Sequence, residues 1–181
     1  MRLRVIAGEL GGRFFQAPPG KTTHPMGERV RGALFNKLAD DINGATVLDA
    51  YAGSGALSFE SISRGAAHTT AIERDRLAQK IIAENVESLG IAAKVKLIKA
   101  NARAWSETSK ESYFDIILCD PPFNDLKLST IAELATHLKP NGLMVLSYVG
   151  SELAPTVNGV VVVDKSNYGN AALAIYRKRD A

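Results

Sequence analysis

Short apolar runs alternate with helix-spaced apolar positions along most of the chain. The runs lie at 46–50, 69–72, 95–98, 114–119 and 143–148, and each has the length and composition of a buried strand. Between them, helices are predicted from about residue 56, over 77–89 with Gly90 placed to cap the end, and over 128–138. This alternation predicts a parallel, doubly wound α/β sheet whose ligands bind at the carboxyl ends of its strands.

Two further apolar runs change one edge of this sheet. Residues 160–164 and 171–176 enclose Tyr168-Gly169-Asn170, which predicts a closing antiparallel hairpin and therefore a mixed sheet of seven strands. In the helix over 77–89, the face expected to be buried consists of Leu77, Ile81, Val86 and Leu89.

A separate hairpin is predicted at the N-terminus. Residues 2–7 and 13–17 are strand-like and are joined through Glu9-Leu10-Gly11-Gly12. Pro18-Pro19-Gly20 interrupts the pattern, and a helix is then predicted over 28–38. We therefore expect a hairpin extension, residues 1–20, followed by a single domain, residues 21–181.

Composition indicates an ordinary soluble protein. Of the 181 residues, 46% are hydrophobic and 23% are charged. No apolar run approaches the ~20 residues of a membrane-spanning helix, and the first residues carry no signal-peptide core. The single cysteine, Cys119, can form no internal disulfide. We expect a monomeric, cytoplasmic protein that does not associate with membranes.

Charge is distributed unevenly. Residues 1–31 hold six basic and two acidic side chains, a local balance of +4, whereas the whole chain carries +3. A one-sided basic surface is typical of phosphate binding, and solvated, solubilising charge is the alternative interpretation. The motifs described below favour phosphate binding, and the residues predicted to contact RNA are Arg2, Arg4, Arg13, Arg29 and Arg31.

A glycine-rich turn follows the strand at 46–50. Gly53 and Gly55 let the backbone bend tightly and approach a ligand, and the helix after them points free amide groups into the same crevice. Ser58 stands where a dinucleotide-binding turn has its third glycine. Asp49 would repel a pyrophosphate but could accept the ammonium group of an amino-acid-like ligand. The turn therefore favours S-adenosyl-L-methionine as the cofactor.

Later strand ends supply further candidate contacts with this cofactor. Glu73 ends the second strand 24 residues after Asp49, where a carboxylate can accept both ribose hydroxyls. Asn101 follows the third strand and is placed to meet the adenine edge through its amide, although most asparagines in such places only form turns. The predicted cofactor-binding set is Asp49, Ala50, Gly53, Ser54, Gly55, Glu73, Arg74, Asn101 and Ala102.

Asp120-Pro121-Pro122-Phe123 follows the fourth strand and indicates the chemistry. An amino group on an aromatic ring is a poor nucleophile while its lone pair is delocalised. The Asp120 carboxylate and the Pro121 carbonyl can accept its two hydrogens, and the consecutive prolines stiffen the backbone that aims these acceptors. Phe123 offers a flat surface on which a base can stack. We predict these four residues as catalytic, with no metal ion, because positioning and desolvation supply the rate.

These motifs together resemble the bacterial RsmD family of ribosomal RNA methyltransferases. The similarity covers nearly the whole chain, through Arg4-Val5-Ile6-Ala7-Gly8, Arg29-Val30-Arg31, Leu34-Phe35-Asn36, residues 48–57, Glu73, Asn101-Ala102, residues 120–123 and Tyr168-Gly169. The resemblance implies a Rossmann-like class I methyltransferase fold with helices on both faces of the sheet. It also implies transfer of a methyl group from S-adenosylmethionine to the exocyclic N2 amino group of a guanine in 16S ribosomal RNA.

One segment departs from the family pattern. The family has Arg-Pro-Thr before a small or polar residue, whereas this chain has His24-Pro25-Met26-Gly27. By the resemblance, this segment lies over the methionine end of the cofactor. The chain is also short, so the expected partner, ribosomal RNA or a partly assembled small ribosomal subunit, must be recognised mainly by shape and phosphate contacts.

Other functions use similar motifs. A DNA adenine or cytosine amino-methyltransferase would share the residues at 120–123, because they recognise an amino group and no particular base. A nicotinamide-dependent oxidoreductase would share the doubly wound sheet, although Ser58 and the Asp-Pro-Pro-Phe motif disfavour it. An RNA-binding protein without activity is a third alternative, which an intact Asp120 disfavours.

Overall fold

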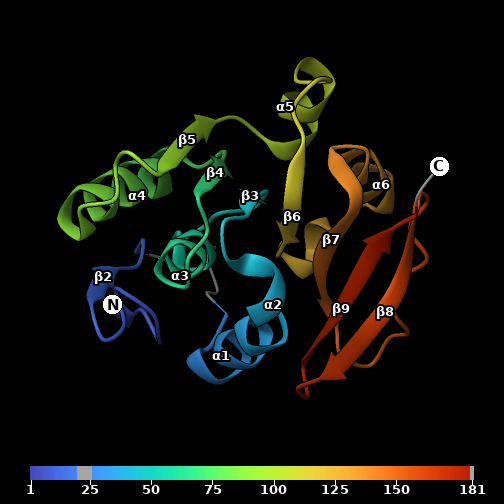
Figure 1. The fold of residues 1–181 in the computed structure, drawn as a ribbon, viewed down its shortest axis with the longest axis horizontal. Helices are drawn as coiled ribbons and strands as arrows, with labels where there is room; N and C mark the ends of the chain where they lie inside the picture. Colours follow the sequence, from blue (N-terminus) through green and yellow to red (C-terminus); the bar gives the residue numbers. More distant parts are fainter. Residues whose placement is uncertain (20–25, 180–181) are drawn as a thin grey trace.

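A computed structural model describes residues 1–19 and 26–179 of the chain. Within them a mixed seven-stranded sheet has the order β5-β4-β3-β6-β7-β9-β8 (Figure 1). Its strands are β3 (Thr46–Asp49), β4 (His68–Glu73), β5 (Val95–Lys99), β6 (Phe114–Cys119), β7 (Leu138–Val149), β8 (Val160–Asn167) and β9 (Ala171–Lys178). The first five are mutually parallel, and β9 runs antiparallel to both β7 and β8. The predicted mixed sheet and closing hairpin are thus confirmed.

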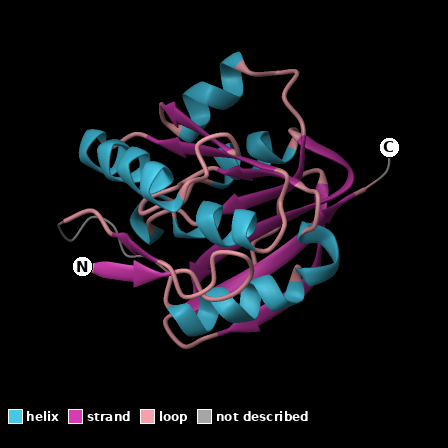
Figure 2. Ribbon diagram, turned by 60° about the vertical axis from the view of Figure 1, so that its left-hand side comes forward, coloured by secondary structure: helices cyan, strands magenta, loops and turns pink. Residues whose placement is uncertain are grey.

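Helices cover both faces of the sheet (Figure 2). Neighbouring strand residues point to opposite faces, so Val47 belongs to a core with helices α1 and α3, whereas Leu48 belongs to a core with α5 and α6. The helices are α1 (Glu28–Lys37), α2 (Ala39–Ile42), α3 (Ala56–Ser63), α4 (Arg76–Leu89), α5 (Ala102–Thr108) and α6 (Leu128–Ala135). In the described residues, no helix is long and apolar enough to cross a membrane.

Helix α4 shows how local signals set its bounds. Its N-cap residue Asp75 accepts a hydrogen bond from the Ala78 amide at 2.9 Å, and Gly90 ends it in the left-handed conformation with φ of 71°. The predicted buried face was wrong by about one residue at its start, because Leu77 is exposed. The helix instead buries Ala78, Ile82, Asn85, Val86 and Leu89.

Three other differences concern the second half of the chain. Helix α5 was not predicted, because its seven residues are too few to show a clear helical period. Helix α6 ends at Ala135, three residues before the predicted end. Strand β7 begins at Leu138 and contains a bend at Asn141, whose φ is 63°. Lys139-Pro140-Asn141-Gly142 therefore interrupts the register between β6 and β7 without ending the strand.

The N-terminal hairpin is formed by β1 (Arg2–Arg4) and β2 (Phe14–Gln16), which are shorter than the predicted runs. It packs against helices of the main domain and does not join the seven-stranded sheet. Phe15 is buried and meets Phe59 of α3 edge-on, with ring centroids 5.0 Å apart. Burial of a phenylalanine side chain contributes about 1.5–3 kcal/mol, so this contact anchors the hairpin.

Candidate functional site

A cleft of about 1190 Å³ opens at the carboxyl ends of β3, β4, β5 and β6. The strand order reverses between β3 and β6, which is where doubly wound sheets form their binding crevice. Most of the predicted site residues line the cleft together: Ala50, Gly53, Ser54, Glu73, Arg74, Asn101, Ala102, Asp120, Pro121, Pro122 and Phe123. Asp49 and Gly55 are not among the lining residues.

Gly55 belongs to the turn without lining the cleft, and the backbone there requires a glycine. Its φ is 85°, and a Cβ atom there would lie 2.6 Å from the Phe59 ring. The turn is tied to the next strand, because the Gly53 amide donates a hydrogen bond to Glu73 Oε1 at 2.8 Å. Glu73 Oε2 accepts a second one from the Asp75 amide at 2.7 Å. These bonds hold the Glu73 carboxylate still at the cleft wall.

Asp49 lies fully buried beneath the turn. Its Oδ2 accepts a hydrogen bond from the Ser58 hydroxyl at 2.8 Å, and its Oδ1 has no hydrogen-bond partner among the described residues. Burial raises the pKa of Asp49 to about 7, and the nearby Asp120 and Glu73 charges act in the same direction. Ser58 stands where a dinucleotide-binding turn has its third glycine, and its hydroxyl fixes the position of this carboxylate.

Asp120 follows directly after strand β6 and lines the cleft. Cys119 pairs with Leu146 of β7, which brings the next residue, Ser147, beside Asp120. The buried Ser147 hydroxyl donates a hydrogen bond to Asp120 Oδ1 at 2.5 Å. Asp120 keeps some accessible surface, but protein surrounds its carboxylate on most sides. This burial raises the pKa of Asp120, and the hydrogen bond from Ser147 acts in the opposite direction. One carboxylate oxygen is therefore engaged, and the described residues give the other no hydrogen bond.

We expect Ser147→Ala to lower the rate of the predicted methyl transfer about tenfold, because Asp120 loses a hydrogen bond to its charged carboxylate. The pKa of Asp120 should rise further, so the acidic limb of the rate–pH profile should move to higher pH. Rates measured across the pH range check this. Ser106→Ala is the matched control, because it removes a buried hydroxyl that contacts His137 instead. An unshifted limb in Ser147→Ala would contradict the positioning role.

At the rim of the cleft, the end of β4 contacts the segment that carries Phe123. Phe123 begins a short 3-10 helix, η1 (Phe123–Asp125), and the residue is 42% exposed. Arg74 reaches across to Asp125 with an Nη2–Oδ2 distance of 3.4 Å. Arg74 therefore links the end of β4 to the segment that carries Phe123, in addition to lining the cleft.

Asn101 forms the N-cap of helix α5, which agrees with the alternative that it serves a turn. Its Oδ1 accepts a hydrogen bond from the Ala104 amide at 2.8 Å and so caps helix α5. The carbonyl oxygen thereby already accepts one backbone hydrogen bond, which leaves its second lone pair and the Nδ2 end for a ligand. Its predicted contact with adenine stays a prediction.

The prediction that Arg31 contacts RNA was wrong. Arg31 is buried, with its Nε 3.6 Å from Glu60 Oε1, and it donates hydrogen bonds to the carbonyls of Met26 and Arg4. The other four predicted RNA contacts are exposed: Arg2, Arg4, Arg13 and Arg29. Arg31 was misassigned because nothing near it in the sequence reveals its acidic partner, 29 residues later on α3.

Several cleft residues were not predicted. They include Tyr51, Asp125, Lys127 and Asn170. Asn170 comes from the turn between β8 and β9, and no local pattern in the sequence places this turn at the cleft. Met26 also lines the cleft, as expected for its segment, whereas His24 and Pro25 lie outside the described residues.

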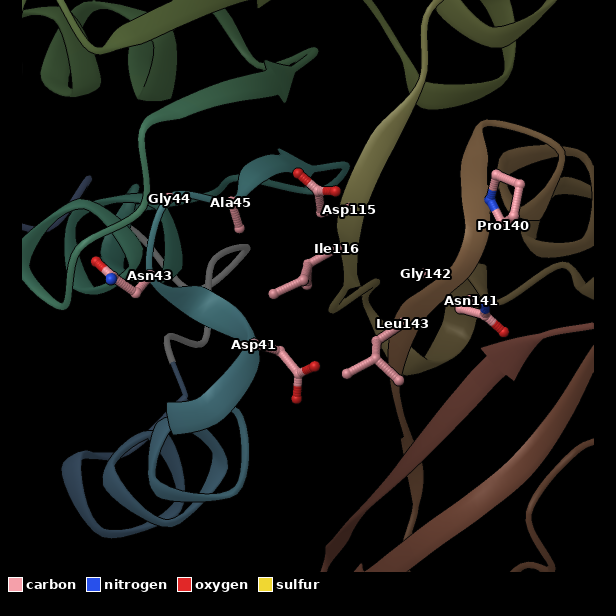
Figure 3. A pocket seen from close by; sticks show the side chains of 10 residues that line it. All are labelled: Asp41, Asn43, Gly44, Ala45, Asp115, Ile116, Pro140, Asn141, Gly142 and Leu143. Carbon is pink, nitrogen blue, oxygen red and sulfur yellow. The ribbon is translucent and has the colours of Figure 1, made fainter.

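A second, smaller pocket of about 240 Å³ lies at the opposite end of the strands (Figure 3). It is bordered by the amino ends of β3 and β6 and by the bend in β7. It is lined by two carboxylates, Asp41 and Asp115. Asp115 is engaged by the Thr46 amide at 2.8 Å and by Lys139 Nζ at 3.4 Å. The contacts of Asp115 therefore connect β3, β6 and β7 at this end of the sheet. The cleft remains the candidate site.

Comparison with known proteins places this cleft in a family. A family model described as conserved hypothetical protein 95 matches residues 3–177. The ribosomal RNA small subunit methyltransferase D of Escherichia coli K12 is 36% identical over 162 residues, which cover 86% of this chain and 79% of that protein. The candidate rRNA methyltransferase YlbH of Bacillus subtilis 168 is 33% identical and covers 98% of this chain and all of its own length.

A solved structure agrees with these relatives. The candidate methyltransferase YhhF of Escherichia coli superposes with a TM-score of 0.90 and 32% identity, and the match covers 100% of both chains. The fold is thus the Rossmann-like class I methyltransferase fold with an N-terminal hairpin. By sequence and by structure, the chain belongs to the RsmD family of small-subunit ribosomal RNA methyltransferases.

Proposed function

We propose that the protein transfers a methyl group from S-adenosylmethionine to the N2 amino group of a guanine in 16S ribosomal RNA. The observation that carries this proposal is the arrangement at Asp120. One of its oxygens is held by Ser147, Phe123 is exposed on the same short segment, and the glycine turn lines the same cleft. Membership of the family supports methyl transfer and ribosomal RNA, and the choice of N2 of guanine rests on the resemblance.

The residues of the cleft fit S-adenosylmethionine. Each Glu73 oxygen accepts one backbone hydrogen bond and retains capacity for a ribose hydroxyl. Asp49 Oδ1 has no hydrogen-bond partner among the described residues, and from beneath the turn the carboxylate would attract the ammonium group electrostatically. Gly53 and Ser54 would lie against the methionine part, with Ala102 and Asn101 toward the adenine.

The chemistry then follows from the acceptors near Asp120. When bound, the cofactor supplies an electrophilic methyl group. The free Asp120 oxygen and the Pro121 carbonyl can accept the two amino hydrogens, which draws the nitrogen toward tetrahedral geometry and localises its lone pair. Methyl transfer would form an N–C bond while the sulfur–methyl bond breaks and its electron pair stays on sulfur. The nitrogen must then lose one proton, and the raised pKa of Asp120 makes its carboxylate a better acceptor for that proton.

Phe123 would hold the substrate base in this position. A base stacked on an aromatic ring gains ~1–3 kcal/mol, and the base must first leave its helix to enter the cleft. Outside the cleft, the exposed Arg2, Arg4, Arg13 and Arg29 are the proposed phosphate contacts. The proposed partner is therefore ribosomal RNA or a partly assembled small subunit.

The test is methyl transfer from labelled S-adenosylmethionine to four substrates: small subunits, naked 16S RNA, large subunits and duplex DNA. We expect label in small-subunit RNA, recovered after nuclease digestion as N2-methylguanosine at one position. The large subunit is the control for nonspecific transfer to RNA. Label confined to DNA would show the DNA amino-methyltransferase alternative to be right.

A further inference from the structure

The outer face of the N-terminal hairpin combines an exposed aromatic ring with two arginines. In the register of β1 and β2, Arg2 pairs with Gln16 and Arg4 pairs with Phe14. Directly paired side chains share a face, so these four side chains point to the side opposite Leu3 and Phe15. All four are exposed, whereas Phe15 is buried in the core. The outer face, defined here as Arg2, Arg4 and Phe14, is therefore open to a partner.

The Phe14 ring is presented in a specific way. Its side chain is 49% exposed, and the Arg2 guanidinium lies over the ring at 3.9 Å from the centroid. This arrangement layers a planar cation on an aromatic plane. Both planes are surfaces on which nucleobases stack in protein–RNA complexes. The strands β1 and β2 contain no acidic residue that would repel a phosphate.

The hairpin is held rigidly enough to serve as a binding surface. The amides of Ile6 and Ala7 donate hydrogen bonds to the buried Glu60 of α3, at 3.0 and 3.2 Å. The backbone of Gln16 exchanges two hydrogen bonds with the Asn85 side chain of α4. A backbone fixed in this way loses little conformational freedom when the hairpin binds a partner, which favours affinity.

We propose that the outer face binds an unpaired nucleotide of the RNA substrate, with the base stacked on the Arg2–Phe14 layer and phosphates near Arg2 and Arg4. This inference rests on the proposed ribosomal RNA substrate. The face does not overlap the cleft, whose lining residues include none of the hairpin. It therefore acts as a second RNA contact, which adds affinity for the substrate and does not enter the chemistry.

An RNA partner explains this surface better than a protein partner does. Arg4 is paired with Glu28 at 2.8 Å, but both side chains are about half exposed, so the pair is weak and its guanidinium can turn to a phosphate. An apolar protein surface would have to desolvate both guanidinium groups in order to cover one ring.

The test compares aromatic and merely apolar side chains at position 14. Binding of a fluorescently labelled single-stranded RNA oligonucleotide is measured for Phe14→Ala, Phe14→Leu and Phe14→Tyr. We expect dissociation constants about tenfold higher for Ala and Leu, whereas Tyr stays within about twofold of the wild type. Tyr113→Ala is the matched control, because Tyr113 is an exposed aromatic residue, 53% accessible, that is not on the hairpin.

The outcomes separate this inference from the proposed function. If Phe14→Leu binds RNA as well as the wild type, the contact is only apolar and the inference is overturned. The same holds if no Phe14 variant weakens binding, even where the wild type methylates ribosomal RNA. Conversely, weaker binding by Ala and Leu supports the second contact even if no guanine in ribosomal RNA is methylated. Thermal unfolding of each variant verifies that it is folded.

Discussion

Asp120→Asn is expected to lower the rate of methyl transfer by about 10²–10³-fold, the loss typical for removal of one group that stabilises a transition state. Asparagine has nearly the same size, but it carries one acceptor oxygen where the carboxylate has two. If the Ser147 hydroxyl keeps that oxygen, the amide NH₂ faces the substrate amine, and two donors then oppose each other. The negative charge that favours loss of a proton from the nitrogen is also removed.

The measurement is a single-turnover rate, with the enzyme in saturating excess over small subunits and labelled S-adenosylmethionine at saturating concentration. Cofactor affinity, measured by calorimetry, is the control, because the residues proposed for the cofactor are separate from position 120. We expect that affinity to change by no more than about threefold. A single-turnover rate within threefold of the wild type would exclude Asp120 from the reaction.

The sequence predicted the centre of the fold well, because the relevant signals there are local. β6 was predicted with its observed bounds, since five of its six residues are apolar and buried, with only Asp115 interrupting the run. The glycine turn and the Asp120–Phe123 segment were also recognisable, because each is a continuous motif. Their meeting in one cleft follows from the parallel strands alone.

Features that depend on distant partners could not be predicted. The Ser147 bond to Asp120 is set by the register of two strands, and the serine itself lies in an otherwise ordinary apolar run. Asn170 reaches the cleft only because β8 and β9 fold back against β7. Arg31 looked like a surface base beside Arg29, and its burial depends on α3, the hairpin and the segment at Met26 at once.

This buried cluster yields the largest expected effect on stability. Glu60 has no accessible surface and receives hydrogen bonds from Ile6, Ala7 and Arg64 in addition to its ion pair with Arg31. Glu60→Ala leaves the Arg31 guanidinium buried without its counter-charge and leaves both hairpin amides without an acceptor. We expect it to lower the free energy of unfolding by about 3–5 kcal/mol, as for other buried pairs that lose one partner.

Replacing the other member of the ion pair should destabilise the protein less. The difference in stability between the two variants is the sharper test. Arg31→Met removes a guanidinium whose Nε has no hydrogen-bond partner, while Glu60 retains Arg64 and the two hairpin amides. We therefore expect a loss of about 1–2 kcal/mol, since Glu60 stays satisfied and only the Met26 and Arg4 carbonyls lose a donor. Urea unfolding of the two variants measures this difference. Hydrogen exchange at the Ile6 and Ala7 amides should accelerate in Glu60→Ala far more than in Arg31→Met. Equal destabilisation by both would mean that the charge of Arg31, and not the acceptors supplied by Glu60, holds the hairpin to the domain.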